Sequence, residues 1–392
     1  MNPLKPAAMR VLPFSSVSTS PDINILLGIA NLEAVPLDGE LREPFVIASD
    51  SSKQTAVDNV LVRLTSVDGY VGLGEASPFP GISGDSQALL LKDIKRFRKR
   101  IIGRSLTLFD LENQTRQAMK FSASRAALEM AFFDILAKRA GIPLGRLLSR
   151  QTFSELPITD ITIPIVTPEK ARVLAQKYLE LGLYRIKIKV GKDVEESVAR
   201  VKAIVEVYGT KRIDDHYLEI LIDANEGYSA EGAIELLKRL SDEGIYPKIF
   251  EQPVQRKNLT GLRQVKLKAN QQNTRVFADE SVYTKMDAAH IIDGDAADGI
   301  NLKLMKHGGI LEAIRIAEMA RRYGLQLMIG GMVETTLAMT ASLHLAKALG
   351  GLEWFDLDTP LLLHQRLLTG GMGYVGAQLI LPQNPGIGVS AI

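Results

Sequence analysis

The feature that most constrains the fold of this chain is a regular alternation of short apolar segments and amphipathic helical segments after about residue 155. Helical segments are predicted, for example, at 168–181, 193–207, 229–243 and 309–323. Eight strands joined by helical crossovers within about 210 residues are the pattern of a (β/α)₈ barrel. We therefore predict an α/β fold built on a (β/α)₈ TIM barrel. Its strands are predicted near 158–165, 184–190, 218–224, 248–253, 275–280, 298–304, 325–330 and 354–358.

The structural alternative is a doubly wound open sheet with helices on both faces. Such a sheet requires a glycine-rich, phosphate-binding turn after its first strand. The segment from Pro164 to Pro168 follows the first predicted strand and contains no glycine. The barrel is therefore favoured.

The part of the chain before the barrel has a different pattern, which predicts an α+β unit. Strands are expected at 23–36 and 57–65, the second leading to the turn signal Asp68-Gly69. The glycine-rich segment Val71–Pro78 is expected to be a loop. Three helices are expected to follow, at 86–102, 106–120 and 124–140.

These patterns divide the chain into four parts. Residues 1–22 are expected to be a disordered N-terminal extension. Residues 23–150 are expected to form the α+β unit, and residues 151–364 the barrel. The tail, residues 365–392, has no barrel element to supply and is expected to pack back onto the α+β unit.

Composition excludes several classes of function. The chain has 47 basic and 45 acidic residues, well interspersed, which disfavours a nucleic-acid partner. No apolar run reaches the roughly 18 residues that span a bilayer, so no membrane partner is expected. The absence of cysteine excludes disulfides, thiolate zinc sites and a cysteine nucleophile. We expect a cytoplasmic enzyme, with a targeting extension at residues 1–22 as the alternative, and a homo-oligomer is common for barrels.

Acidic residues follow three successive predicted strands at a constant interval. Asp223, Glu251 and Asp279 are each separated by 28 residues, about one strand–helix repeat. The carboxyl ends of barrel strands meet at one mouth, so three carboxylates are expected side by side. Their mutual repulsion calls for a cation, and an all-oxygen ligand set favours Mg²⁺, with Mn²⁺ as the second choice.

Lysine residues flank these carboxylates in the predicted ring. Lys187 and Lys189 alternate with isoleucines on the second strand, so both are expected to face the barrel interior. Lys303 is on the sixth strand, opposite the second in a ring of eight. Burial and a like-charged neighbour predict a lowered lysine pKa, as a general base near neutral pH requires.

This arrangement suggests a 1,1-proton transfer on a small carboxylate substrate. One lysine removes the proton next to the carboxylate, and the other returns a proton to the opposite face. A metal ion would hold the carboxylate and stabilise the enediolate that develops. Two alternatives from other classes remain: a metal-binding barrel without catalysis, and a metal hydrolase, which would require histidine near the metal.

The ordered set of strand-end motifs resembles the enolase superfamily, and within it the muconate-lactonizing-enzyme-like subgroup. The resemblance covers residues 23 to about 388. Any one motif is weak, but the ordered set is specific. It consists of Lys187-Ile188-Lys189-Val190-Gly191, Ile222-Asp223-Ala224-Asn225, Phe250-Glu251-Gln252-Pro253, Ala278-Asp279-Glu280-Ser281 and Asn301-Leu302-Lys303-Leu304-Met305-Lys306.

The resemblance implies a role for each matching residue. Asp223, Glu251 and Asp279 would bind Mg²⁺, while Lys189 and Lys303 would be the two acid/base residues. Lys187 would support Lys189 and the substrate carboxylate. The outer partners of the metal ligands would be Asn225 and Glu280. Residues 23–150, completed by 365–392, would form a capping domain over the catalytic barrel of residues 151–364.

The eighth strand narrows the implied activity. Phe355-Asp356-Leu357-Asp358-Thr359-Pro360 is similar to the Asp-x-Asp motif of the dipeptide epimerases, the group that contains L-Ala-D/L-Glu epimerase. There the two aspartates would hold the free ammonium group of a dipeptide substrate. The predicted enzyme is an isomerase that epimerises the C-terminal residue of a dipeptide. Other members of the subgroup remain as alternatives: N-acylamino-acid racemase, o-succinylbenzoate synthase or muconate cycloisomerase.

One position departs from the pattern of the Ala-Glu-specific enzymes. The loop after Pro44-Phe45 would be expected to carry a basic residue, and here it carries Asp50, with Lys53 nearby. An acidic side chain in that loop would repel a glutamate substrate. We therefore predict that Asp50 contacts the substrate and that its second residue is cationic or apolar, unless Asp50 points to solvent.

Overall fold

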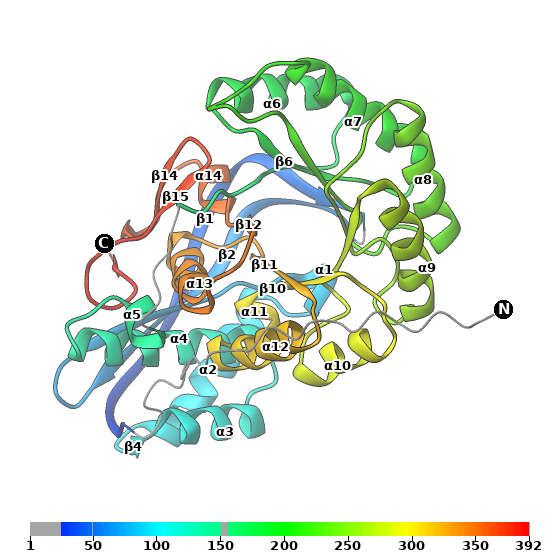
Figure 1. The fold of residues 1–392 in the computed structure, drawn as a ribbon. Coiled ribbons are helices and arrows are strands. Elements are labelled where there is room, and N and C mark those ends of the chain that lie inside the picture. Colours follow the sequence, from blue (N-terminus) through cyan, green and yellow to red (C-terminus); the bar gives the residue numbers. More distant parts are fainter. Residues whose placement is uncertain (1–24, 49, 150–155, 392) are drawn as a thin grey trace.

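The protein was analysed as a computed structural model, which describes residues 25–48, 50–149 and 156–391. Within these residues eight parallel strands form one sheet, in the order β12-β11-β10-β9-β8-β7-β6-β5. Figure 1 shows them as a ring with helices outside it. The strands are β5 (Ile161–Ile163), β6 (Arg185–Lys189), β7 (Glu219–Asp223), β8 (Ile249–Glu251), β9 (Arg275–Ala278), β10 (Gly299–Leu302), β11 (Gln326–Gly330) and β12 (Trp354–Asp356).

The two end strands of this sheet meet and close the ring. Thr159, just before β5, forms a parallel bridge with Phe355 of β12. The backbone N–H of Asp160 donates to the carbonyl of Phe355 at 2.9 Å. The predicted α/β fold with a (β/α)₈ barrel is confirmed, and each strand falls within the range expected from the sequence.

The outer helices of the barrel begin at side-chain caps that the sequence supplies. Thr167, Asp193, Ser229 and Asn258 each accept a backbone N–H from the first turn that follows. The crossover helices are α6 (Pro168–Glu180), α7 (Val194–Tyr208), α8 (Ala230–Asp242), α9 (Leu259–Ala269) with the 3₁₀ turn η1 (Asn270–Gln272), α10 (Lys285–Asp293), α11 (Leu304–His307), α12 (Ile310–Arg322), α13 (Thr336–Leu349) and α14 (Thr359–Leu362).

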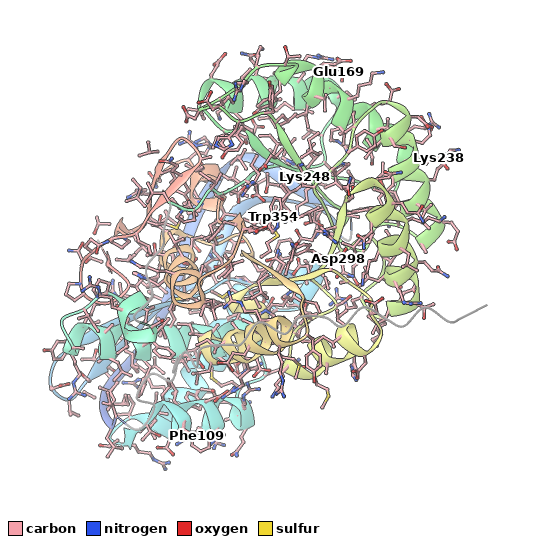
Figure 2. All side chains as sticks on the ribbon, in the orientation of Figure 1. Phe109, Glu169, Lys238, Lys248, Asp298 and Trp354 are labelled. Carbon is pink, nitrogen blue, oxygen red and sulfur yellow. The ribbon has the colours of Figure 1, made fainter. Side chains whose placement is uncertain are left out.

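The interior of the barrel is layered, because inward-facing residues recur at every second position. Leu221, Ile249, Phe277 and Met328 form an apolar cluster with Trp354 packed against it. Leu221, Ile249 and Met328 lie two residues before their strand ends, and Phe277 lies two residues before Asp279, so a polar layer sits directly above the apolar one. Trp354, Lys248 and Asp298, at or just before the starts of β12, β8 and β10, lie around the middle of the ring in Figure 2. The apolar layer therefore separates the polar mouth from the opposite end of the barrel, where the strands begin.

The N-terminal unit consists of an antiparallel sheet and a helical layer. Its strand order is β3-β2-β1-β4, and β1 and β2 form a long hairpin. The strands are β1 (Leu27–Ile47), β2 (Asp50–Ser66), β3 (Val71–Ala76) and β4 (Ser105–Leu106). The helices are α1 (Pro80–Ser83), α2 (Gln87–Ile101), α3 (Leu108–Ala118), α4 (Ser122–Arg139) and α5 (Leu144–Leu148).

The segment expected to be a glycine-rich loop is instead strand β3, and its glycines have a packing role. A Cβ on Gly72 would lie 2.0 Å from the carbonyl oxygen of Ala131, and one on Gly74 would lie 1.9 Å from that of Ala127. Both carbonyls belong to α4. The two glycines therefore let the helix backbone rest directly on the sheet, which periodicity alone does not distinguish from a loop.

The tail after β12 contacts both parts of the molecule. Its strands are β13 (Thr369–Gly370), β14 (Gly373–Val375), β15 (Gln378–Ile380) and β16 (Val389–Ser390). The N–H of Leu144 donates to Gly386 at 2.7 Å, and that of Thr159 donates to Ala377 at 2.9 Å. The boundaries predicted at residues 22 and 150 lie outside the described residues, so the division into 1–22, 23–150 with 365–392, and 151–364 stays a prediction. Among the described helices, none has the length and apolarity needed to cross a bilayer.

One buried glutamate joins the N-terminal sheet to the barrel. Glu75 of β3 has no exposed surface and accepts hydrogen bonds at the start of α13. Its donors there are Thr335 N–H at 2.8 Å, Thr335 Oγ1 at 2.6 Å and Ala338 N–H at 3.1 Å. Asn59 Nδ2 of β2 donates at 2.6 Å. A carboxylate is well suited to this position, because it satisfies the free N–H groups of a helix N-terminus.

Replacing Glu75 by glutamine should destabilise the contact between the two parts. The amide keeps the shape but has only one acceptor oxygen, so buried donors lose their partner. We expect the free energy of unfolding to fall by about 2–4 kcal/mol, read from urea unfolding curves. Glu33→Gln, an exposed change on β1, is the control and should have almost no effect. Equal stability of both variants would contradict the proposed role of Glu75 in joining the N-terminal sheet to the barrel.

Candidate active site

The three predicted metal ligands stand on adjacent strand ends, as expected. Asp223 pairs in register with Glu251 across β7 and β8. Asp279 directly follows β9, and all three residues are at most 1% exposed. Asn301 of β10 donates its amide to Glu251 Oε1 at 2.8 Å. The carboxylates that the 28-residue spacing predicted therefore stand at the ends of three neighbouring strands, and their role as metal ligands stays a prediction.

Lysine ammonium groups lie among these carboxylates. Lys189 Nζ is 2.6 Å from Asp223 Oδ2, and Lys303 Nζ is 2.7 Å from Asp279 Oδ2. Lys187 Nζ lies 2.8 Å from Glu251 Oε2 and 3.1 Å from Asp223 Oδ2. The lysines come from strands on opposite sides of the ring, β6 and just after β10. Each acid/base candidate is thus paired with one predicted metal ligand.

The lowered lysine pKa expected from the sequence is not found for Lys187 or Lys303. Burial favours the neutral amine, but nearby carboxylates outweigh it and raise the pKa of both groups. For Lys303 the dominant carboxylates are Asp279 and Glu251. The prediction was based on burial and on the neighbouring lysine, which both lower a lysine pKa, and it gave too little weight to the carboxylates at the mouth, which raise it. The acids respond in turn: Lys189 and Lys187 overcome burial and lower the pKa of Asp223 to about 2.

The pair from the eighth strand lies at the same mouth. Asp356 Oδ2 accepts from Lys187 Nζ at 2.7 Å. Asp358 Oδ2 accepts from the backbone N–H of Thr162 at 2.6 Å. Burial, and then the charge of Asp356, raise the pKa of Asp358 to about 7. The two aspartates alternate with buried Leu357, as the Asp-x-Asp pattern requires for a shared face.

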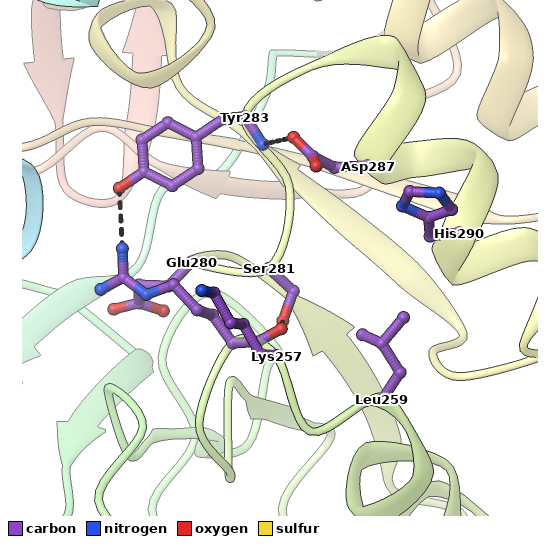
Figure 3. A pocket seen from close by; sticks show the side chains of 8 residues that line it. Lys257, Leu259, Glu280, Ser281, Tyr283, Asp287 and His290 are labelled. Carbon is purple, nitrogen blue, oxygen red and sulfur yellow. Dashed lines mark hydrogen bonds between the residues drawn. The ribbon is translucent and has the colours of Figure 1, made fainter.

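The predicted outer partners contact each other. Asn225 Nδ2 donates to Glu280 Oε1 at 2.9 Å, and both residues are buried. Burial, and then Asp279, raise the pKa of Glu280 to about 8. Asn225 has a positive φ of 40°, a conformation that asparagine tolerates better than most residues. Glu280 also borders a second cavity, lined by Ser281, Tyr283 and others on the α10 side (Figure 3).

For Asp50 the structure describes only the backbone, which lies at the tip of the hairpin. It begins β2 and pairs with Ile47 at the tip of the hairpin. Its side chain lies outside the described residues, so its contact with substrate stays a prediction. Ile47, its partner in the ladder, is buried and lines the cavity at the mouth.

Sequence reasoning did not give roles to several residues at the mouth. Lys306 is 2% exposed and donates to Asp279 Oδ1 at 2.5 Å and to the carbonyl of Asn301 at 3.1 Å. Asp160 has no exposed surface and lies beside Asp356 and Asp358, with one oxygen of each within 4.8 Å of the others. The period-two pattern was the available signal, because Asp160 alternates with Thr162 as Asn301 does with Lys303.

A cavity opens above these side chains, between the barrel and the N-terminal unit. Its polar lining comes from the barrel strand ends and includes Lys189, Lys303, Asp356 and Asp358. Its apolar lining comes from the hairpin tip, from the loop after β3 and α1, and from the loop after β11. These apolar residues are Ile47, Phe79, Ile82, Met332 and Val333. We call this space the mouth cavity.

The donor set at the mouth suits a hard divalent cation. Asp223, Glu251 and Asp279 offer only carboxylate oxygens, and each is buried at a strand end. Burial, and then the charge of Asp223, raise the pKa of Glu251 to about 7, which is the response of acids crowded at one site. A cation there would neutralise this repulsion and would compete with the lysines for the same oxygens.

Comparison with known proteins agrees with this geometry. Residues 31–149 match the mandelate racemase / muconate lactonizing enzyme N-terminal domain, and residues 170–391 match the enolase C-terminal domain-like family. The chain belongs to the mandelate racemase/muconate lactonizing enzyme family. This membership confirms the predicted resemblance to the enolase superfamily and, together with relatives named as epimerases, identifies the protein as an enzyme of the isomerase class.

Several members of the family are similar over most of their length. An L-Ala-D/L-amino acid epimerase of Populus trichocarpa is 38% identical over 354 residues, covering 89% of this chain and 81% of its own. A hydrophobic dipeptide epimerase of Enterococcus faecalis is 36% identical, covering 90% and 96%.

Solved structures of family members have the same fold. A substrate-liganded L-Ala-D/L-Glu epimerase of Bacillus subtilis superposes with a TM-score of 0.86 and 32% identity, covering 93% of this chain and all of its own. The dipeptide epimerase of Enterococcus faecalis, complexed with Mg and L-Leu-L-Tyr, gives a TM-score of 0.84 and 34% identity, covering 93% and 100%.

Proposed function

We propose that the protein is a Mg²⁺-dependent dipeptide epimerase that inverts the α-carbon of the C-terminal residue. The observation that carries this proposal is the lining of the mouth cavity. Two lysines from opposite sides of the ring, Lys189 and Lys303, share it with the carboxylates of Asp356 and Asp358. Two bases suit proton transfer on both faces of one carbon, and two carboxylates suit a free ammonium group. Relatives named as dipeptide epimerases support the same assignment.

In this proposal each side chain has one task. One of the two lysines takes the α-proton, and the other delivers a proton to the opposite face of the carbon. Lys187, between Glu251 and Asp356, contributes positive charge for the substrate carboxylate. The apolar layer below the mouth limits access of water from that end, which strengthens the electrostatic contribution of each group.

Asp223, Glu251 and Asp279 would hold the metal ion, with Mg²⁺ preferred and Mn²⁺ as the second choice. When bound, the ion supplies positive charge that offsets the negative charge developing on the substrate carboxylate. Asn225 and Glu280 would fix the outer side of this ligand set, since Asn225 N–H donates to Asp223 Oδ1 at 2.9 Å.

The mouth cavity favours an apolar side chain on the second residue of the dipeptide. Among the described residues, this lining includes no basic side chain except the two lysines assigned to proton transfer. A glutamate side chain packed against these residues would be buried without a cationic partner, at substantial cost. Ile47, Phe79 and Ile82 instead offer apolar contact. Of the two classes expected from Asp50, the described lining favours the apolar one.

The activities of other family members fit this lining less well. Substrates of N-acylamino-acid racemases, o-succinylbenzoate synthases and muconate cycloisomerases lack a free ammonium group. They would leave the Asp356 and Asp358 carboxylates opposite a neutral or anionic group, which is unfavourable in a buried site.

Deuterium exchange tests the proposal directly. The protein is incubated in D₂O with Mg²⁺ and pooled L,L-dipeptides, and the mass of each dipeptide is followed. We expect a gain of one mass unit on dipeptides with leucine, phenylalanine or tyrosine at the second position. The rate of this mass gain should be about tenfold or more higher for L-Ala-L-Leu than for L-Ala-L-Glu, the factor expected for a buried, unpaired charge.

The matched controls are N-acetyl-L-leucine and the acetylated form of the same dipeptide. Exchange on these compounds, with none on the free dipeptides, would favour N-acylamino-acid racemisation. No exchange on any substrate by a folded protein that binds Mg²⁺ would disprove the proposed activity. Faster exchange on the glutamate dipeptide would overturn only the apolar preference.

A further inference from the structure

The proposed reaction gives no role to Asp160, a buried acid at the mouth. Asp160 lies just before β5, has no exposed surface, and is not part of the lining of the mouth cavity. One of its oxygens is within 4.8 Å of an oxygen of both Asp356 and Asp358. Three carboxylates this close in a buried site do not all ionise, because each added charge repels the others.

The hydrogen-bond donors around the cluster distinguish its three members. Asp356 accepts from Lys187 at 2.7 Å, and Asp358 accepts from Thr162 N–H at 2.6 Å. Neither oxygen of Asp160 has a hydrogen-bond donor among the described residues. An ionised carboxylate without a donor is the most costly buried state, so the proton belongs on Asp160. Burial, and then the charge of Asp356, raise the pKa of Asp160 well above its ordinary range.

We propose that Asp160 is a neutral carboxylic acid that donates its O–H to Asp356 and positions that carboxylate for the substrate ammonium group. The proposal rests on the function proposed above. Lys187 holds one oxygen of Asp356, and the O–H of Asp160 would restrain the carboxylate from the neighbouring strand. Asp160 acts through Asp356, without touching substrate, and is therefore a positioning residue.

The alternative for this cluster is a second bound cation, which would require Asp160 to be ionised. The charged groups facing Asp160 are Lys187 from β6 and the aspartates Asp356 and Asp358 from β12 and its end. Asp160→Asn keeps a hydrogen-bond donor for Asp356 and carries no charge. Asp160→Leu has a side chain of similar size but carries neither a donor nor a charge. These two variants therefore separate a neutral donor from an ionised ligand.

The pH dependence of stability tests the protonation of Asp160 without any substrate. A proton held only in the folded state makes the wild type lose stability as pH rises above about 3.9, the ordinary aspartate pKa. Asparagine has no such loss. The melting temperature of Asp160→Asn relative to wild type should therefore rise between pH 4.5 and 7.5, by about 3 °C or more. Exposed Asp293→Asn is the control, with a nearly constant difference. A relative melting temperature that falls with pH would show that Asp160 is ionised and overturn the proposal.

Steady-state kinetics on L-Ala-L-Leu test the positioning role. Asp160→Leu should raise KM by about tenfold, the effect expected when one hydrogen bond is removed, with a smaller change in kcat. Asp160→Asn should rescue KM to within about threefold of wild type. Equal KM increases in both variants, or none in Asp160→Leu, would overturn the role. A wild type that epimerises no dipeptide would disprove the proposed function, while the stability experiment would still decide the state of Asp160.

Discussion

Lys303→Ala should abolish epimerisation while leaving proton exchange on one enantiomer. In the proposed mechanism its amine is the acid/base group on one side of the mouth cavity, and Lys189 remains on the other. We expect the epimerisation rate to fall by at least about 10²–10⁴-fold, the usual contribution of such a group. In D₂O, the variant should still exchange the α-proton of the one enantiomer that faces Lys189. Lys189→Ala should show the opposite preference.

The design separates loss of chemistry from loss of structure. Lys303 is ion-paired with buried Asp279, and breaking such a pair costs about 3–5 kcal/mol. Lys303→Arg keeps the charge and should preserve the fold while lacking the base. Lys248→Ala, an exposed change before β8 at the other end of the barrel, should leave turnover unchanged. Total loss of exchange on both enantiomers in both lysine variants, with folding intact, would contradict the two-base mechanism.

Asp223→Asn should lose both metal affinity and activity. The substitution removes one of three carboxylates and breaks the ion pair that Asp223 forms with Lys189 at 2.6 Å. We expect the dissociation constant for Mg²⁺, measured by titration calorimetry, to rise by about 10²-fold or more. Treatment of the wild type with EDTA should abolish exchange, and added Mg²⁺ should restore it.

Glu219→Gln is the matched control, because Glu219 begins the same strand and pairs with Arg185 away from the mouth. It should change neither metal affinity nor turnover. Unchanged Mg²⁺ affinity in Asp223→Asn would remove Asp223 from the proposed ligand set. EDTA-resistant exchange would argue against a metal-dependent reaction altogether.

The barrel and its charged mouth were predictable because they follow from periodicity. Lys187 and Lys189 face inward since strands alternate, and Asp223, Glu251 and Asp279 converge since strand ends share one face. Family membership was predictable from the same motifs in order. None of this required knowledge of side-chain contacts.

Other features depend on contacts that a linear pattern does not contain. Gly72 and Gly74 read as a loop, because the helix that packs on them is more than 50 residues away in sequence. The raised pKa of Lys303 depends on how many carboxylates surround it. Asp160 is a single acid beside a strand start, and only the folded ring places it against Asp356, 196 residues later.

Two of the apolar walls of the mouth cavity are held in place by different contacts. Phe79 follows β3, which is held by the Gly72 and Gly74 contacts and by Glu75 on α13. Ile47 sits at the hairpin tip, where the contacts from the barrel include the N–H of Ile165 on Val46 at 3.2 Å and the ion pair of Lys170 with Glu43 at 2.8 Å. Mutations at the tip can therefore change which substrate the cavity accepts without lowering the stability of the whole protein. We expect new substrate preferences to evolve through the hairpin, while the wall after β3 stays constant.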